Sequence, residues 1–354
     1  MTTHKNISRP LHKLSDSDNG LRVTSVNVAR RAGVSQSTVS RVFSASDTVA
    51  EETVQRVRKV AKQLGYKPNA IARSLSNRRT DMIGILMSEI TSPFYPYVLE
   101  KFSQRLHELG KRVLLFTTSP KEDADHVLQY ALQYQVDGLI LANITLTSAV
   151  VRESIKYKTP LVLFNRYVKG VQARSVTCDN VAGGRMVADA LLDSGHKALA
   201  YIAGRPEAST HVDREAGFIN RLAERGYTGV LREQGYYTYE SGYEACRRLL
   251  KLAQPPDAIF CANDITAMGA IDAARDLGVK IPEQLSVIGF DDIPAATWSA
   301  YSLTTVRQPV NQMIEACVSV LLESVERPNS KPMAQVIPGE LIRRGSARLA
   351  TTLD

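Results

Sequence analysis

Two hydrophobic patterns follow one another along the chain. Up to about residue 64, apolar residues recur every three or four positions, which is typical of helices that bury one face. From Met82 onward, short apolar runs such as MIGILMS (82–88) alternate with helical segments, which predicts repeated strand–helix units. The pattern therefore predicts a small all-α head followed by a larger α/β core.

Within the head, residues 24–43 (TSVNVARRAGVSQSTVSRVF) form two short predicted helices joined at Ala32-Gly33-Val34. Thr24 and Ser35 are placed to cap them, and Gly33 accepts the positive φ that the turn requires. On the second helix, Gln36, Ser37, Ser40 and Arg41 face away from the apolar side formed by Val39, Val42 and Phe43. Such polar groups can bond base edges or phosphates, so the segment predicts a DNA-binding helix-turn-helix, with an ordinary pair of core helices as the alternative.

The positive charge of the chain is concentrated in the same region. Residues 21–80 contain twelve Lys and Arg against three Asp and Glu, a net charge of +9, whereas the whole chain carries +8. The rest of the chain therefore adds no net positive charge. This clustering favours a head that meets the phosphates of DNA.

The strand–helix units of the core predict parallel, doubly wound sheets. Strands are expected at 82–88, 112–118, 137–143, 160–165, 174–178, 198–204, near 235–237, and at 258–263, 285–290, 335–338 and 340–343, with helices at 94–109, 123–135, 148–157, 180–194, 213–226, 240–252, 264–277 and 308–326. These are too many strands for one comfortable sheet, and Asp179–Gly184 is a natural dividing point. Two α/β lobes result, and ligands of such folds bind at the carboxyl ends of the strands, in the cleft between the lobes.

These elements divide the chain into regions. They are a disordered tail at 1–20, the helix-turn-helix domain at 21–66, a hinge helix and linker at 67–80, a first lobe made of 81–178 and 307–334, a second lobe made of 179–306 and 335–345, and a tail at 346–354.

The composition excludes several classes of protein. No apolar run approaches the ~20 residues that cross a bilayer, and residues 1–20 lack the apolar core of a signal peptide, so we expect a cytoplasmic protein with no membrane partner. The four cysteines are scattered without metal-ligand spacing, which predicts buried free thiols. The six histidines share no spacing that suggests a catalytic or metal site, so no metal or cofactor is expected.

Six segments carry a resemblance that covers residues from about 22 to 345. They are VARRAGVSQSTVSRVF, ETVQRVRKVAKQLGYKPNAIARSL, IGILMSEITSPFY, AIFCANDITAMGAI, LGVKIPEQLSVIGFDDI and LTTVRQP. Together, and in this order, they resemble the lactose- and galactose-repressor (LacI/GalR) family of bacterial transcription regulators. The resemblance implies a two-lobed core like that of periplasmic sugar-binding proteins, and a homodimer that binds double-stranded, palindromic operator DNA under the control of a small effector.

The resemblance also implies roles for residues of the head. Gln36, Ser37 and Arg41 match positions whose side chains enter the major groove. Arg41 can bond guanine through two nitrogens and is the leading base reader, with a phosphate contact as its alternative. Caps and contacts to the DNA backbone are expected from Thr24, Ser35, Thr38, Asn69 and Arg73.

The predicted hinge helix at 69–76 (NAIARSLS) adds a second contact with DNA. Leu75 matches the leucine that the family inserts into the minor groove at the centre of the operator, where it partly unstacks a base step. Ala72 is small enough for the hinges of two subunits to approach closely. The alternative is that Leu75 anchors a linker on the core.

For the core, the resemblance implies an effector cleft built from both lobes. The matching positions are Phe94, Tyr95, Asn165, Arg166, Thr210, Arg214, Tyr237, Asn263, Asp264, Asp291 and Gln308. Carboxylate, amide and guanidinium groups with aromatic faces suit a polyhydroxylated ligand such as a sugar, sugar acid or sugar phosphate. Asp291 is the leading contact because it follows a strand, whereas structural roles are equally open for Tyr95, Asn263 and Gln308.

One departure from the family bears on the effector. Many relatives have Asp-Arg where this chain has Asn165-Arg166. Without that carboxylate, Arg166 and Arg214 are less neutralised, which favours an anionic effector, with a neutral sugar as the alternative.

The sequence therefore predicts a ligand-controlled DNA-binding regulator of the repressor type, and not an enzyme. A sugar-binding protein of a transport system would share the core but would have an export signal and no basic head. An enzyme would need a nucleophile–base pair, a metal cluster or a phosphate loop, and Gly183-Gly184 lies inside a predicted helix instead.

Overall fold

The computed structural model describes residues 23–44, 48–67, 80–88, 90, 92–118, 124–143, 151 and 159–350. The chain divides into two compact units, Met1–Thr80 and Asp81–Asp354, each of which is considered by itself. The first unit is helical and the second contains two parallel-sheet α/β lobes, so the predicted fold class is confirmed. The predicted tail at 1–20, the hinge at 69–76 and, apart from Val151, the helix at 148–157 lie outside the described residues.

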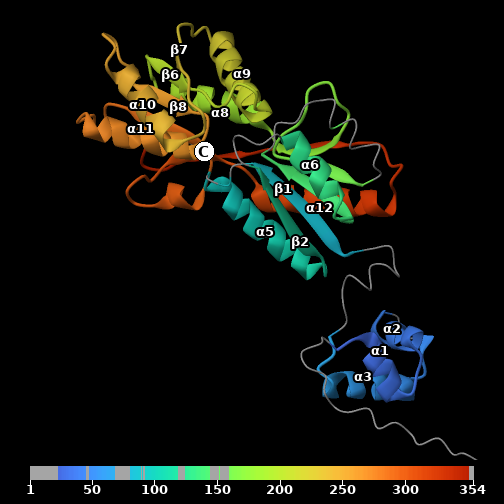
Figure 1. Cartoon of the computed structure of the whole chain (residues 1–354). Helices are drawn as coiled ribbons and strands as arrows, with labels where there is room; N and C mark the ends of the chain where they lie inside the picture. The colour runs from blue at the N-terminus through green and yellow to red at the C-terminus, as the bar shows by residue number, and fades with distance from the viewer. Residues whose placement is uncertain are drawn as a thin grey trace, which may run out of the picture. The chain divides into compact units, whose positions relative to one another are not determined.

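Three helices form the first unit: α1 (Ser25–Ala32), α2 (Gln36–Ser44) and α3 (Glu51–Gln63) (Figure 1). They pack around a small core of aliphatic side chains, namely Val28, Ala29, Ala32, Val39, Val42, Val54, Val57 and Ala61. Gly33 has a φ of 66° and turns the chain from α1 into α2. The three helices lie where the apolar pattern predicted them.

The sheet of the first lobe has six parallel strands in the order β11-β5-β4-β3-β1-β2. The strands are β1 (Met82–Ser88), β2 (Arg112–Thr118), β3 (Gly138–Ala142), β4 (Leu161–Phe164), β5 (Arg174–Cys178) and β11 (Ala334–Ile337). Its described helices are α5 (Phe94–Glu108), α6 (Ala124–Leu132) and α12 (Val310–Glu326) (Figure 1). β3 and β4 are fully buried, as expected for central strands of a parallel sheet covered by helices.

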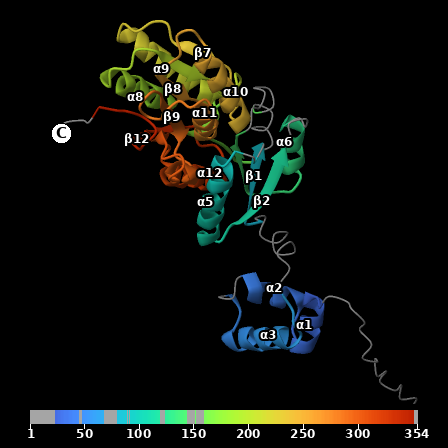
Figure 2. The same ribbon diagram turned by 90° about the vertical axis from the view of Figure 1, so that its left-hand side faces the viewer.

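The sheet of the second lobe also has six strands, in the order β12-β10-β9-β8-β6-β7, and only β12 is antiparallel to its neighbour. The strands are β6 (Leu199–Ile202), β7 (Leu231–Glu233), β8 (Ala258–Cys261), β9 (Ser286–Asp291), β10 (Thr304–Arg307) and β12 (Glu340–Ile342). Four helices pack in pairs beside this sheet, α8 (Asn180–Asp193) with α9 (Ser209–Glu224) and α10 (Tyr239–Leu250) with α11 (Asp264–Asp276) (Figure 2).

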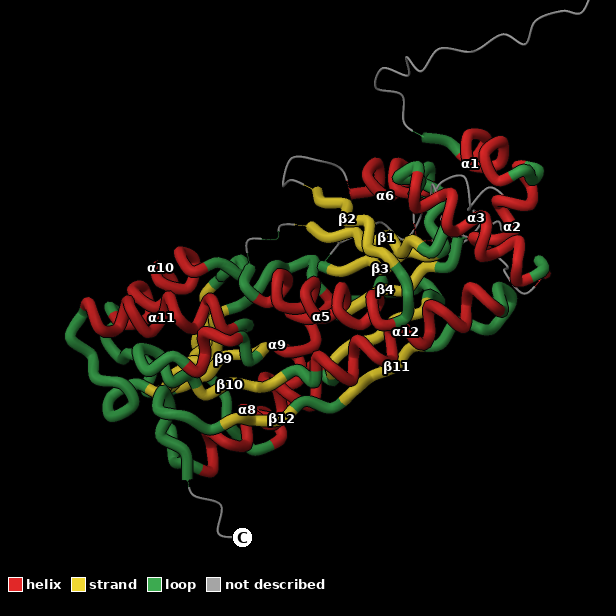
Figure 3. Tube along the Cα trace, turned by 90° about the horizontal axis from the view of Figure 1, so that it is seen from below, coloured by secondary structure: helices red, strands yellow, loops and turns green. Residues whose placement is uncertain are grey.

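In the described part of the core, the chain passes between the lobes three times: after β5, between β10 and α12, and between β11 and β12 (Figure 3). β11 pairs with β5, so the assignment of 335–345 to the second lobe is wrong for residues 335–337. Strand β11 follows α12 and completes the sheet on which α12 packs, and the chain crosses over only after it.

The predicted tail at 346–354 is also wrong in part. Ser346 and Ala347 are buried, and the Val287 backbone N–H donates to the carbonyl of Ser346 at 2.8 Å. The carbonyl of Arg348 lies 3.1 Å from the buried His196 ring. Residues 346–350 therefore pack on the second lobe, because their backbone groups satisfy polar groups at its surface.

Three further predictions in the second lobe need correction. The strand expected near 235–237 lies at Leu231–Glu233, and α9 begins at Ser209 and not at 213. Strand β10 was not expected, because it begins with two threonines and has no apolar run that would predict a buried strand. Thr304 and Thr305 are fully buried, and each hydroxyl has a hydrogen-bond partner inside the lobe.

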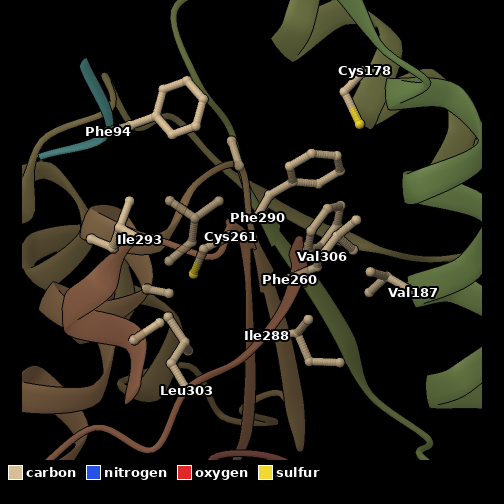
Figure 4. Packing of buried hydrophobic residues seen from close by; sticks show 14 of the residues in the cluster. Phe94, Cys178, Val187, Phe260, Cys261, Ile288, Phe290, Ile293, Leu303 and Val306 are labelled. Carbon is tan, nitrogen blue, oxygen red and sulfur yellow. The ribbon is translucent and has the colours of Figure 1, made fainter. Parts of the chain in front are cut away.

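Glycines let the helix pairs of the second lobe approach closely. A Cβ at Gly217 of α9 would lie 2.2 Å from the Val181 carbonyl of α8, and one at Gly269 of α11 would lie 2.1 Å from the Tyr239 carbonyl of α10. The main core cluster includes Phe260 and Phe290 (Figure 4). All four cysteines are buried free thiols, as expected.

Candidate DNA-binding face and effector pocket

The second helix of the head exposes the side chains that the sequence singled out. Gln36, Ser37 and Arg41 are exposed on α2, whereas Val39 and Val42 are buried on its other face. Gln36 Nε2 donates to Ser25 Oγ at 3.1 Å, and Arg41 Nε donates to the Ser37 carbonyl at 3.5 Å. The helix thus presents a row of amide, hydroxyl and guanidinium groups on the side opposite the core.

Of the two residues expected to cap α1 and α2, Ser35 accepts the hydrogen bond of a cap, whereas Thr24 makes no side-chain cap bond and is bonded through its backbone N–H. Ser35 Oγ accepts from the Thr38 backbone N–H at 3.1 Å and lies 2.8 Å from the Thr38 hydroxyl. The Thr24 backbone N–H donates to Asn27 Oδ1 at 3.0 Å. The expected hinge contacts Asn69, Ala72, Arg73 and Leu75 lie outside the described residues.

In the core, both lobes line a cavity. The first lobe contributes Ser92, Tyr95, Asn143, Asn165 and Arg166, and the second contributes Arg205, Thr210, Arg214, Tyr236, Tyr237, Thr238, Asn263 and Asp291. Most of these residues lie at or just beyond the carboxyl ends of strands, or in the first turn of the helix that follows. This is where parallel sheets bring loops together and where ligands of such folds bind.

Eight of the eleven residues expected at the effector cleft line this pocket, and three do not. Phe94 is buried in the core (Figure 4). Its ring lies edge-on to that of Tyr95, with 5.2 Å between the centroids. Asp264 turns inward, where it accepts hydrogen bonds from the Ile293 N–H and the Thr305 hydroxyl. Gln308 lies behind the lining and donates to Asp291 Oδ1 at 2.7 Å. The structure therefore does not bring these three side chains to the pocket, because packing directs them into the interior.

Arg214 is the central charged group of the pocket wall. Its Nη2 lies 3.1 Å from Asp291 Oδ1, its Nε donates to Asn180 Oδ1 at 2.8 Å, and its Nη1 donates to the Ala262 carbonyl at 2.6 Å. The guanidinium also stacks 3.6 Å from the centroid of the Phe290 ring. Because every nitrogen has a partner, the orientation of Arg214 is set by the second lobe alone.

Burial raises the pKa of two carboxyl groups in this region, those of Asp291 and Asp264. It raises the pKa of Asp291, although the charge of Arg214 and the hydrogen bond from Gln308 oppose the rise. Burial raises the pKa of Asp264 well above its ordinary range, and the charge of Asp291 adds to this effect. Asp291 is therefore the acidic side chain that lines the pocket, and Asp264 is a structural group behind it.

Sequence reasoning missed five lining residues: Ser92, Asn143, Arg205, Tyr236 and Thr238. Asn143 follows strand β3 directly, so the strand-end rule that found Asn165 could also have found it. The others lie on connections whose course depends on the neighbouring strands.

Unusual backbone conformations also mark the pocket. Positive φ angles occur at Asn143 (59°), Asn165 (64°), Tyr237 (63°) and Asp291 (123°), all of which line it. A tyrosine is a costly residue at such an angle, and the region of Asp291 is one that glycine normally occupies. The fold therefore holds strained residues where the ligand-facing side chains converge.

Within the described residues, no group of three His, Cys, Asp or Glu side chains could hold a metal ion. The helices that the structure describes include none that is long and apolar enough to span a bilayer.

Comparison with known proteins gives matches to both units. Residues 26–69 match the model for bacterial regulatory proteins of the lacI family, and residues 188–347 match a periplasmic binding protein-like domain. The HTH-type transcriptional repressor PurR of Erwinia tasmaniensis is 33% identical, and the alignment covers 90% of this chain and 95% of that protein. The regulator AscG of Escherichia coli is 31% identical over 91% of this chain and 98% of its own.

Solved structures agree with this result. The transcriptional regulator CelR in complex with cellobiose has a TM-score of 0.71 and 30% identity, with 92% of this chain and 100% of that chain covered. The lac repressor dimer bound to operator and an anti-inducer has a TM-score of 0.84 at 24% identity, over 93% of this chain and 100% of that chain, which shows the shared fold.

Proposed function

Because the chain belongs to the LacI family of bacterial regulatory proteins, we propose that it is a transcriptional repressor whose hold on operator DNA is controlled by a small molecule bound between its lobes. The observation that carries the proposal is the polar pocket, which takes its lining from the strand ends of both sheets. A ligand held by both lobes favours one arrangement of them over another, and DNA affinity and ligand affinity are then coupled reciprocally. The protein would act in the cytoplasm and without catalysis.

The head supplies the DNA-binding part of this proposal. The exposed face of α2 supports a role in the major groove for Gln36, Ser37 and Arg41, with Thr24, Ser35 and Thr38 as caps and backbone contacts. Two copies in a homodimer would read the two halves of a palindromic operator, and the hinge residues Leu75 and Ala72 would meet at its centre. The solved lac repressor dimer on operator DNA supports this arrangement by its likeness of fold.

The charges of the pocket favour an anionic effector. Three guanidinium groups, on Arg166, Arg205 and Arg214, line it together with one carboxylate, on Asp291. Arginine nitrogens bond carboxylate and phosphate oxygens through a planar fork, while the tyrosine, threonine and asparagine groups suit hydroxyls. We infer that the effector is a sugar acid or sugar phosphate. A neutral sugar is the second candidate, supported by the relative whose structure contains cellobiose.

A calorimetric comparison of matched ligands tests the effector class. Glucose, gluconate and glucose 6-phosphate, and the corresponding pentose and disaccharide sets, are titrated into the full-length protein. The proposal expects the charged member of a set to bind at least tenfold more tightly than its neutral parent. Equal or weaker binding of the charged member would refute the anionic effector and leave the neutral sugar.

The DNA-binding part is tested separately. Operator sites are selected from random duplexes with the full-length protein, and affinity is measured by fluorescence anisotropy with and without the bound effector. Arg41→Ala is expected to weaken binding about tenfold and to relax the preference at one base pair of each half-site. If Arg41→Ala weakens all sequences equally, the residue is a phosphate contact. A protein that selects no sequence at all would contradict the repressor.

A further inference from the structure

Tyr167 of the first lobe makes two hydrogen bonds to the second lobe. It lies three residues beyond the end of β4, and its acceptors lie in the first two turns of α9, both of which are labelled in Figure 3. The Tyr167 backbone N–H donates to Ser209 Oγ at 3.2 Å, and its hydroxyl donates to Asp213 Oδ1 at 2.9 Å. Both bonds therefore join the two lobes directly.

These three residues alternate along the chain with residues of the pocket. Arg166 precedes Tyr167, Thr210 follows Ser209, and Arg214 follows Asp213. Ser209 and Asp213 are four residues apart and share one face of α9. A movement that separates Tyr167 from this face also moves Arg166 away from Thr210 and Arg214.

The pair itself does not face the pocket. Tyr167 and Asp213 line a separate recess and are not among the residues that line the effector pocket, so a ligand in that pocket does not touch them. Their influence on the ligand must therefore pass through the neighbouring pocket residues.

The protonation of the pair suits a lasting hydrogen bond. Burial and the hydrogen bond to Asp213 raise the pKa of Tyr167 to about 12, so the hydroxyl keeps its proton and donates. Burial also raises the pKa of Asp213, while the bond from Tyr167 opposes that rise. The bond joins a neutral donor to a half-buried carboxyl group, and Tyr167 itself is 40% exposed.

We propose that Tyr167, together with Ser209 and Asp213, is a positioning device that holds the two lobes closed over the effector and slows its release. The proposal rests on the proposed function in that the pocket is taken as the effector site. These side chains neither line the effector pocket nor belong to the predicted hinge helix at 69–76.

The test compares two tyrosines with the same chemistry and different placement. Tyr167→Phe removes the donor of the hydroxyl-to-carboxylate bond between the lobes, and Asp213→Ala removes its acceptor. Tyr243→Phe is the matched control, because its hydroxyl donates to Asp276 Oδ2 at 2.7 Å within the second lobe. The double variant Tyr167→Phe/Asp213→Ala shows whether the two single effects come from one interaction.

Amide hydrogen exchange of the ligand-free, full-length protein gives a readout that needs no effector. Exchange in segments 165–168 and 204–214 is expected to rise about tenfold in Tyr167→Phe and Asp213→Ala, no further in the double variant, and not at all in Tyr243→Phe. An unchanged rate in Tyr167→Phe, or the same rise in the control, would overturn the proposal. A rise spread over the whole core indicates general destabilisation and also counts against it.

Release kinetics give the second readout. Whichever compound of the calorimetric panel binds the unmodified protein is expected to dissociate about tenfold faster from Tyr167→Phe, with little change in its association rate. If no compound of the panel binds, the proposed effector class fails, and the exchange result still decides the positioning role. If a compound binds and its release is unchanged, the positioning role fails while the effector site stands.

Discussion

The two lobes have sheets of six strands each but contribute to the pocket in different ways. The second lobe supplies eight of the thirteen lining residues, and its charged pair Arg214 and Asp291 is already joined at 3.1 Å. The first lobe supplies five, and the buried Oδ1 of Asn165 has no hydrogen-bond partner among the described residues. The second lobe thus fixes its central arginine with its own groups, whereas the first lobe brings to the pocket a buried amide oxygen that no described residue bonds.

This difference suggests that the stability of the core and its affinity for the ligand can be changed separately, because they depend on different lobes. The second lobe is tightened by glycine contacts between helix pairs and by a buried ion pair, so changes there should mainly lower the free energy of unfolding. The pocket residues of the first lobe should mainly change ligand affinity. Six substitutions in four experiments test this difference, from the largest expected effect to the smallest.

Arg214→Met should have the largest effect, because it leaves Asp291 buried without its cation. We expect the free energy of unfolding, measured in urea, to fall by about 3–5 kcal/mol. Arg166→Met in the first lobe is the counterpart and should cost less than half of that while it still weakens effector binding. Equal losses of stability in the two variants would break the comparison.

Gly217→Ala in the second lobe and Gly84→Ala in the first test the same contrast by packing. A Cβ at Gly217 would meet the Val181 carbonyl at 2.2 Å, whereas one at Gly84 would meet the end of the Leu139 side chain at 2.5 Å. The backbone cannot yield as a leucine methyl can, so we expect losses of about 3 and about 1 kcal/mol in unfolding free energy. A larger loss of unfolding free energy for Gly84→Ala than for Gly217→Ala would show that the contact between α8 and α9 is less tightly packed than the surroundings of Gly84.

Glu215 should make the second lobe sensitive to acid. Its burial opposes ionisation, but hydrogen bonds from His211 and Arg232 outweigh this and lower its pKa from 4.5 to about 2. A lowered carboxyl pKa contributes stability that is present above pH 4.5 and is lost as the pH falls toward 2. We expect Glu215→Gln to remove about 2 kcal/mol of this pH dependence.

The measurement is the free energy of unfolding of both proteins between pH 6 and the acid limit of folding. Other carboxyl groups titrate in the same range, so the difference between the two curves is the quantity of interest. Parallel curves would show that Glu215 is not held ionised by its partners.

Asn165→Asp should have the smallest effect on stability and a clear effect on binding. The new carboxylate would lie beside Arg166 at the pocket and would repel an anionic ligand. We expect the calorimetric affinity for a sugar acid or phosphate to fall about tenfold, about 1.4 kcal/mol, with the neutral sugar affected less. A uniform loss for charged and neutral ligands would show that charge at this position does not select the effector.

Much of the pocket could be predicted from the chain because its residues follow recognisable strands. Asn165, Arg166, Asn263 and Asp291 come directly at strand ends, and parallel strands bring these ends to one edge. Phe94 and Asp264 occupy equally suitable positions, yet packing turns both inward. Arg205 and Tyr236 lie on longer connections, and the misplacement of the strand near 235–237 concealed the second of them.

The sequence by itself determined the helical head, the alternation of strands and helices and the concentration of basic charge, because these are properties of neighbouring residues. Only the tertiary structure decided that β11 joins the first lobe, that Asp264 faces away from the pocket, and that Tyr167 meets Asp213 across 46 positions of chain. Such contacts depend on the order of strands in a sheet and on the direction of each loop. No local pattern of hydrophobic and polar residues specifies either of them.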